Sequence, residues 1–152
     1  MSDGTNEPVP HLDQEVIEFA HKMFDLARAG DAEQLLAYVD AGLPVNLTDP
    51  QGNTLLMLAA YHGQAAVVAG LAERGADIER TNDRGQTPLA GAVFKGDQDV
   101  IDLLVRLGAD LDAGHPTARE TAAMFGRTIP GATGPVIPGS DAEGPDREGP
   151  AE

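Results

Sequence analysis

The sequence predicts an all-α solenoid in which short helix–turn–helix units stack on one another. Two observations lead to this prediction. The chain matches itself when it is shifted by 33 residues, and a fixed period of this size is typical of stacked repeats. Each period also holds two short apolar segments separated by glycine, and no run of strand-forming residues long enough to build a sheet. Helices this short are marginal alone, so neighbouring units must stabilise them.

The period is clearest between residues 49 and 113. Glycine, threonine, leucine and a Gly-Ala-Asp triplet recur at the same spacing in both copies. The matching pairs are Gly52 and Gly85, Thr54 and Thr87, Leu56 and Leu89, Gly63 and Gly96, and the triplets at 75–77 and 108–110.

Each unit carries signals for helix starts and stops. Thr54 can accept hydrogen bonds from the first free N–H groups of a helix over residues 55–61. Gly63 suits the end of that helix, and Gly75 suits the end of a second helix over residues 65–73. The predicted unit is therefore turn, helix, turn, helix.

These residues resemble the ankyrin repeat, whose pattern runs D-x-x-G-x-T-P-L-H-x-A-A-x-x-G, then a V-V-x-L-L helix, then G-A-D. Residues 49–63 read D-P-Q-G-N-T-L-L-M-L-A-A-Y-H-G, and residues 82–96 read N-D-R-G-Q-T-P-L-A-G-A-V-F-K-G. The resemblance implies an ankyrin repeat solenoid with β-turn or hairpin connections. One departure is that the pattern's histidine is Met57 in one copy and Ala90 in the other. This removes a side chain that often braces neighbouring hairpins in the family, so the local rigidity of the hairpins is in doubt.

Two full repeats are predicted, flanked by atypical units, because the end units of a solenoid have one face in water. Asp13 is a candidate N-cap for the first helix, and a last helix is predicted from Thr117 to Phe125. Ten of the last 24 residues are glycine or proline, with acids between them, so this segment cannot offset its ordering entropy. The predicted parts are a flexible leader (1–11), a cap repeat (12–48), full repeats (49–81 and 82–114), a half repeat (115–127) and a disordered acidic tail (128–152).

Composition excludes several classes of function. The net charge of −15 argues against binding nucleic acid or an anionic membrane surface, and it suits a partner protein with a basic surface. The absence of cysteine excludes disulfides and thiol chemistry. There is no membrane-spanning stretch, and the acidic amino terminus does not resemble a secretory signal. We therefore expect a cytoplasmic protein, a monomer, whose excess of arginine over lysine hints at a bacterial source.

A search for catalytic or metal-binding patterns finds little. The four histidines have no i, i+3 or i, i+4 spacing, so no metal site or other cofactor is predicted. Asp110 and Asp112 could be paired carboxylates of an enzyme, but no acid or base partner is placed against them. The repeat pattern also assigns this site to an ordinary turn.

The remaining candidate is a surface for binding another protein. In the ankyrin pattern, the hairpin tips and the two residues after A-A vary freely, and stacking places equivalent positions in columns on the concave face. One column is Arg28, Tyr61, Phe94 and Met124, and beside it run Ala29, His62, Lys95 and Phe125. We interpret Phe125 as a cover for the terminal core, and Tyr61 and Phe94 as binding anchors. The predicted binding residues are Arg28, Gln51, Asn53, Tyr61, His62, Arg84, Gln86, Phe94, Lys95 and Met124.

The leading hypothesis is a non-catalytic adaptor or regulator that binds a partner protein through its concave face. The resemblance also suggests a more specific version, because similar small bacterial ankyrin proteins are sometimes associated with stress-response enzymes such as catalase. Two alternatives stay open. One is an effector delivered to a host cell, with its signal in the tail, and the other is an enzyme that uses the carboxylates near Asp110.

Overall fold

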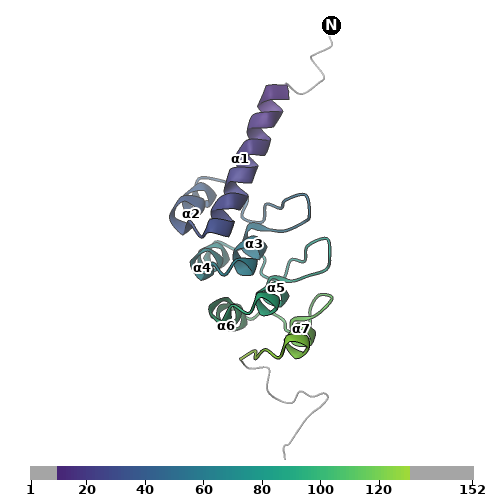
Figure 1. The fold of residues 1–152 in the computed structure, drawn as a ribbon. Helices are drawn as coiled ribbons and strands as arrows, with labels where there is room; N and C mark the ends of the chain where they lie inside the picture. The colour runs from purple at the N-terminus through teal and green to yellow at the C-terminus, as the bar shows by residue number, and fades with distance from the viewer. Residues whose placement is uncertain (1–9, 131–152) are drawn as a thin grey trace, which may run out of the picture.

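The computed structural model describes residues 10–130, which form seven helices (Figure 1). The only β-pairing in the described residues is an isolated bridge between Thr48 and Thr54. The predicted all-α class is therefore confirmed. The helices are α1 Pro10–Ala29, α2 Ala32–Asp40, α3 Leu55–Tyr61, α4 Ala65–Glu73, α5 Pro88–Lys95, α6 Gln98–Arg106 and α7 Ala118–Phe125.

The helices stack in two layers. Helices α1, α3, α5 and α7 each contact the next in that order and form the inner layer, whereas α2, α4 and α6 form the outer layer. Figure 1 shows the loops that precede α3, α5 and α7 projecting from one side of the stack. We call these the hairpin loops. The arrangement places the inner helices beside the hairpin loops along one face.

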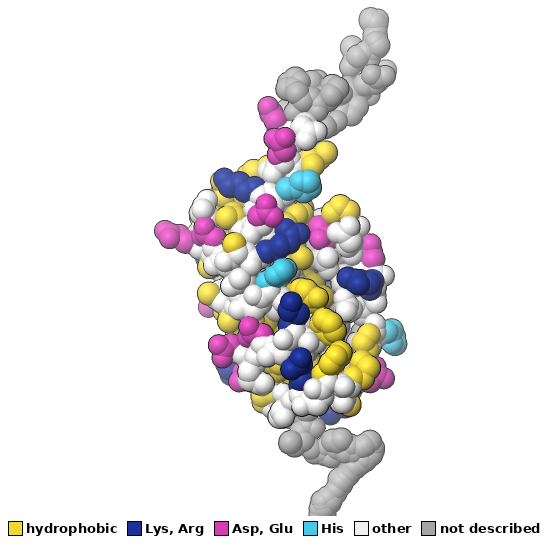
Figure 2. Space-filling model, viewed as in Figure 1, with side chains coloured by type: hydrophobic (Ala, Val, Ile, Leu, Met, Phe, Trp, Pro, Cys, Tyr) yellow, Lys and Arg dark blue, Asp and Glu magenta, His cyan; other side chains and the backbone are white. Residues whose placement is uncertain are grey.

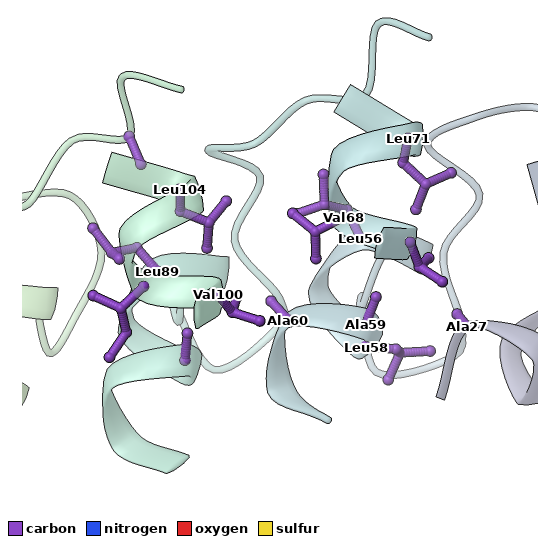
Figure 3. Packing of buried hydrophobic residues seen from close by; sticks show 14 of the residues in the cluster. Ala27, Leu56, Leu58, Ala59, Ala60, Val68, Leu71, Leu89, Val100 and Leu104 are labelled. Carbon is purple, nitrogen blue, oxygen red and sulfur yellow. The ribbon is translucent and has the colours of Figure 1, made fainter. Parts of the chain in front are cut away.

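The hydrophobic core lies between the two layers, and it repeats with the sequence. Leu56 of α3 and Leu71 of α4 are fully buried, as are Leu89 and Leu104 at the equivalent positions of the next unit (Figure 3). Burying one such side chain contributes about 1.5–3 kcal/mol. The repeat in the chain is thus a repeat in packing.

Threonine starts three of the inner helices as predicted. The hydroxyl oxygens of Thr54, Thr87 and Thr117 accept backbone N–H hydrogen bonds within the first turn, at 3.0 Å, 3.1 Å and 3.0 Å. The carboxylate of Glu120 also accepts from the Thr117 N–H at 2.9 Å, which completes a capping box. These caps determine where the hairpin loops end.

The first helix begins earlier than predicted. Helix α1 starts at Pro10, so Pro10 and His11 of the predicted leader are helical, and Asp13 lies inside the helix instead of capping it. Proline suits the first turn of a helix, because its missing N–H would have no partner there. Figure 1 shows that α1 extends beyond the rest of the stack. Residues 1–9 of the predicted leader lie outside the described residues.

The folded part of the chain also extends further at its C-terminal end. The predicted tail starts at residue 128, yet Ile129 is only 3% exposed and belongs to the hydrophobic core. The side-chain amide of Gln98 also donates to the Thr128 carbonyl at 3.5 Å. Residues 128–130 are therefore part of the domain, and the rest of the predicted tail, 131–152, lies outside the described residues.

Hydrogen bonds connect neighbouring hairpin loops. The Asp83 N–H donates to the Gln51 carbonyl at 2.9 Å, and the His115 N–H donates to the Gly85 carbonyl at 2.8 Å. Met57 and Ala90, which stand in place of the family's histidine, are buried in the inner layer. Backbone contacts thus join the loops where the side chain expected by the family pattern is missing.

Candidate partner-binding surface

The surface formed by the ends of the inner helices carries a continuous row of aromatic rings. The Tyr61 and Phe94 rings are nearly parallel, with centroids 6.3 Å apart and an angle of 11° between their planes. The Phe94 and Phe125 rings meet edge to face, with centroids 5.3 Å apart. Both geometries are favourable for aromatic pairs. We call Tyr61, Phe94 and Phe125 the aromatic row.

The row follows from the period of the sequence. Tyr61 and Phe94 are one period apart and occupy the same position in α3 and α5, so stacking of these helices brings their rings together. In the last unit the hairpin loop is shorter, and Phe125, rather than the predicted Met124, contacts Phe94. Phe125 is 48% exposed and extends the row of rings beyond Phe94, and its interpretation as a cover for the terminal core stays a prediction.

The rings are accessible to a partner. Phe94 is 42% exposed, and Met124 beside the row is 64% exposed, whereas Tyr61 is half-buried. Figure 2 shows a group of hydrophobic side chains in the lower half of the face, bordered by dark-blue Lys and Arg side chains. Large apolar side chains in such a group, next to polar neighbours, are typical of protein interfaces.

Two cations contact the row from its flanks. The Lys95 ammonium lies 4.7 Å from the Tyr61 ring centroid, and the Arg127 guanidinium lies 5.8 Å from the Phe125 centroid. Arg127 also donates through Nη2 to the Phe94 carbonyl at 3.3 Å. These contacts hold positive charge against ring faces, which carry partial negative charge.

Sequence reasoning missed Arg127, although a signal was present. Gln64 and Arg127 both follow the glycine after an inner helix, and both donate to a backbone carbonyl one unit back: Gln64 to Arg28 at 2.7 Å, and Arg127 to Phe94. The predicted surface columns contain only positions before that glycine. The position after it belongs to the same face.

A shallow hollow of ≈160 Å³ lies between α3 and the second hairpin loop. Five of the ten predicted binding residues line it: Asn53, Tyr61, His62, Arg84 and Gln86. Arg28 and Gln51 line a neighbouring hollow between α1 and the first hairpin loop. Phe94 and Lys95 both contact the ring of Tyr61, which lines the hollow between α3 and the second hairpin loop. Met124, which precedes Phe125, lines neither of these two hollows.

Polar residues at the hollow have different roles. The Asn82 amide donates to the side-chain oxygens of both Asn53 and Gln86, at 2.9 Å and 3.1 Å, so these two predicted residues also support the hairpin loops. Arg84 is exposed and lines the hollow. The pKa of His62 lies below its usual value, because of partial burial and then the positive charges of Arg28 and Lys95.

The carboxylates considered for an enzyme are engaged in structural contacts. Asp110 accepts a hydrogen bond from the Asp112 N–H at 2.8 Å, as in a turn. Asp112 forms an ion pair with Arg119 at 2.9 Å, and this guanidinium holds the pKa of Asp112 below its usual value. Both residues therefore stabilise the loop before α7. Within the described part of the chain, no three His, Cys, Asp or Glu side chains come together as a metal site.

Together, the fold and this face define a stacked helical repeat protein with a surface suited to another protein. The family model for ankyrin repeats in three copies matches residues 23–115, and the chain belongs to the ankyrin repeat family. Ankyrin repeats are protein–protein interaction modules. A protein of Pseudomonas aeruginosa named as an ankyrin repeat protein, PA3287, is 50% identical over 64 residues, which is 42% of this chain and 37% of that protein. Among the described residues, none of the helices has the length and apolar character needed to cross a membrane.

Proposed function

We propose that the protein is a non-catalytic adaptor or regulator that binds a partner protein through the inner helices and hairpin loops. The observation that carries this proposal is the exposed aromatic row, in which three rings from three successive units contact one another. Isolated exposed aromatic residues are ordinary, but a row that spans α3, α5 and α7 forms one apolar surface. Such a surface can bury a continuous part of a partner.

The row has the properties of an interface centre. Large, rigid aromatic side chains lose little conformational entropy on binding, and a few such residues supply most of the affinity of an interface. We expect each true anchor to contribute about 2 kcal/mol or more, which is roughly thirtyfold in Kd. Asn53 and Gln86, which the hairpin network holds in place, would form part of a pre-organised rim.

The test compares two faces of the same protein. Affinity capture from native cytosol, followed by mass spectrometry, would identify a partner, and its Kd would then be measured with purified proteins. Catalase, which the family resemblance suggests, is one candidate to assay directly. The double variant Tyr61→Ala, Phe94→Ala should abolish binding while circular dichroism shows an intact fold.

The matched control changes the outer layer. Charge reversal at Glu73 of α4 and Asp102 of α6 should leave the Kd unchanged, because these residues lie on the outer helices. Loss of binding in the outer-layer variant, together with full binding in the aromatic variant, would refute the proposal. The cytoplasmic location, the bacterial source and the monomeric state expected from the sequence remain predictions.

A further inference from the structure

The surface around the aromatic row differs in charge from the protein as a whole. The chain has a net charge of −15, yet Arg84, Lys95 and Arg127 lie around the row and its adjoining hollow. Within the described residues, none of these three cations forms a salt bridge; the salt bridges there involve Arg28, Arg74 and Arg119. A concentration of cations on an acidic protein therefore surrounds the proposed interface.

Among the described residues, nearby carboxylates form no salt bridge with these cations. Asp25 pairs with Arg28 at 2.8 Å, and Asp97 accepts a hydrogen bond from the Val100 N–H as the N-cap of α6. Asp83, at the tip of the second hairpin loop, is an exposed carboxylate on this side. Figure 2 shows dark-blue side chains beside the yellow group, and magenta side chains along α1, over the outer layer and on the side of the hairpin loops.

The cations stand at both ends of the row. Lys95 lies over Tyr61 and Arg84 lines the hollow beside it, while Arg127 lies over Phe125 at the other end. The ring centroids are 6.3 Å and 5.3 Å apart. In an extended chain, alternate side chains on one face are roughly 6.5 Å apart. An extended segment could thus place alternate apolar side chains over successive rings.

We infer that the row binds an acidic segment of the partner protein, with carboxylates on both sides of a short apolar stretch. This inference rests on the proposed function and specifies the chemistry of its partner. It also reverses the expectation, drawn from net charge alone, that the partner has a basic surface. Local charges determine the complementarity of an interface, because charges more than a Debye length away are screened at physiological salt.

The experiment uses the full chain and three fluorescein-labelled peptides of equal length. The first peptide has glutamates on both sides of a short stretch that contains phenylalanines, and its other residues are glycine and serine. In the second peptide glutamine replaces every glutamate, and in the third lysine does. Fluorescence anisotropy at low salt should give a Kd about tenfold lower for the glutamate peptide than for the glutamine peptide. Added salt should reduce that preference.

Charge-matched variants locate the effect. Lys95→Gln with Arg127→Gln should remove the preference for the glutamate peptide. Lys22→Gln with Arg106→Gln lowers the net charge equally, but Lys22 contacts Tyr38 of α2 and Arg106 belongs to outer helix α6, so the preference should persist. Phe94→Ala should weaken the binding of glutamate and glutamine peptides alike.

The inference would be overturned by no binding of the glutamate peptide, by equal binding of all three peptides, by tighter binding of the lysine peptide, or by tighter binding of oligothymidylate, which would indicate a nucleic-acid surface. Residues 131–152 carry five acidic residues and one arginine. A glutamate peptide that binds only after their removal would make this chain's own segment the occupant, and that too would overturn the inference. The proposed function has a separate test, because capture of the natural partner through Tyr61 and Phe94 does not depend on peptide charge.

Discussion

The side-chain amide of Asn82 donates a hydrogen bond to the side-chain oxygen of Asn53, one repeat earlier, at 2.9 Å. Within its own loop, the Asn82 oxygen accepts from the N–H groups of Arg84 and Gln86, at 3.0 Å and 3.1 Å. Asn82 is only 7% exposed, so these bonds have little competition from water. One side chain therefore both shapes a hairpin loop and joins it to its neighbour.

Two substitutions separate these roles. Asn82→Ala removes both and leaves two backbone donors without partners, so we expect a loss of about 1–3 kcal/mol in unfolding free energy. Asn82→Asp keeps the acceptor, as Asp49 does at the equivalent position, but it removes the amide that donates to Asn53 and Gln86. The loss in Asn82→Asp should be smaller. Urea denaturation measures both, and equal losses would assign the whole effect to the bonds that the Asn82 amide donates, to Asn53 and Gln86.

The core of the third repeat gives a second prediction. Leu104 is fully buried between the layers, whereas its neighbour Leu103 is only partly buried, on the outer side of α6. Leu104→Ala should lower the unfolding free energy by about 2–5 kcal/mol, and Leu103→Ala should cost clearly less. Measured by urea denaturation, the reverse order would show that the phase of α6 is wrong.

Much of the fold could be predicted from the sequence because its signals are local. Thr54 and Gly63 mark the limits of α3, and the observed helix, Leu55–Tyr61, has the predicted bounds. The contact between Tyr61 and Phe94 follows from the period alone. Features that depend on the ends of the stack could not be predicted in this way.

The differences have a common physical origin. The predicted column allows for the shorter last loop and passes through Met124, yet the ring that meets Phe94 belongs to the next residue, Phe125. Ile129 lies in a Gly- and Pro-rich stretch whose composition predicts no structure, yet it is buried where the chain folds back after α7. Tertiary packing overrides local composition at both positions.

The position of Ile129 changes what truncation should do. A chain that ends at Pro130 keeps every residue that the structure describes, so its thermal midpoint should stay within a few degrees of that of the full chain. A chain that ends at Thr128 loses a side chain that is 3% exposed. Removing so much buried apolar surface costs about 2–5 kcal/mol, which should lower the midpoint by several degrees. Calorimetry on both chains, with Ile129→Ala in the full chain, provides the check. Equal midpoints for the two truncated chains would contradict this prediction.

Two helical glycines should respond differently to alanine. A Cβ at Gly91 of α5 would lie 3.3 Å from the terminal methyl of Met57, a flexible side chain that can move slightly. A Cβ at Gly70 of α4 would overlap the Leu36 side chain, of which three carbons lie too close. Gly91→Ala should therefore raise the unfolding free energy by about 0.5–1 kcal/mol through helix propensity, whereas Gly70→Ala should lower it by about 1–3 kcal/mol. Thermal denaturation measures both, and a gain for Gly70→Ala would show that the outer helices are less tightly packed than described.

Glu79 should make stability depend on pH. Burial, and then the negative charges of Asp110 and Asp77, raise the pKa of Glu79 above its usual 4.5, although the Asp110 N–H donates to its Oε2 at 2.6 Å. Its other oxygen, Oε1, is buried without a hydrogen-bond partner. The folded state therefore favours the protonated acid. The stability that this preference contributes is fully present below the unfolded pKa and is lost as pH rises through the folded pKa.

Glu79→Gln replaces the carboxylate with a neutral group that can still accept from the Asp110 N–H. At pH 7 the variant should be more stable than the wild type, because it avoids burying a charge. The advantage should shrink as the pH falls towards 4.5 and the wild-type acid becomes protonated. Urea midpoints measured across this range give the difference between the two proteins. An advantage for Glu79→Gln that grows on acidification would mean that the hydrogen bond from Asp110 outweighs desolvation and lowers the pKa of this carboxyl.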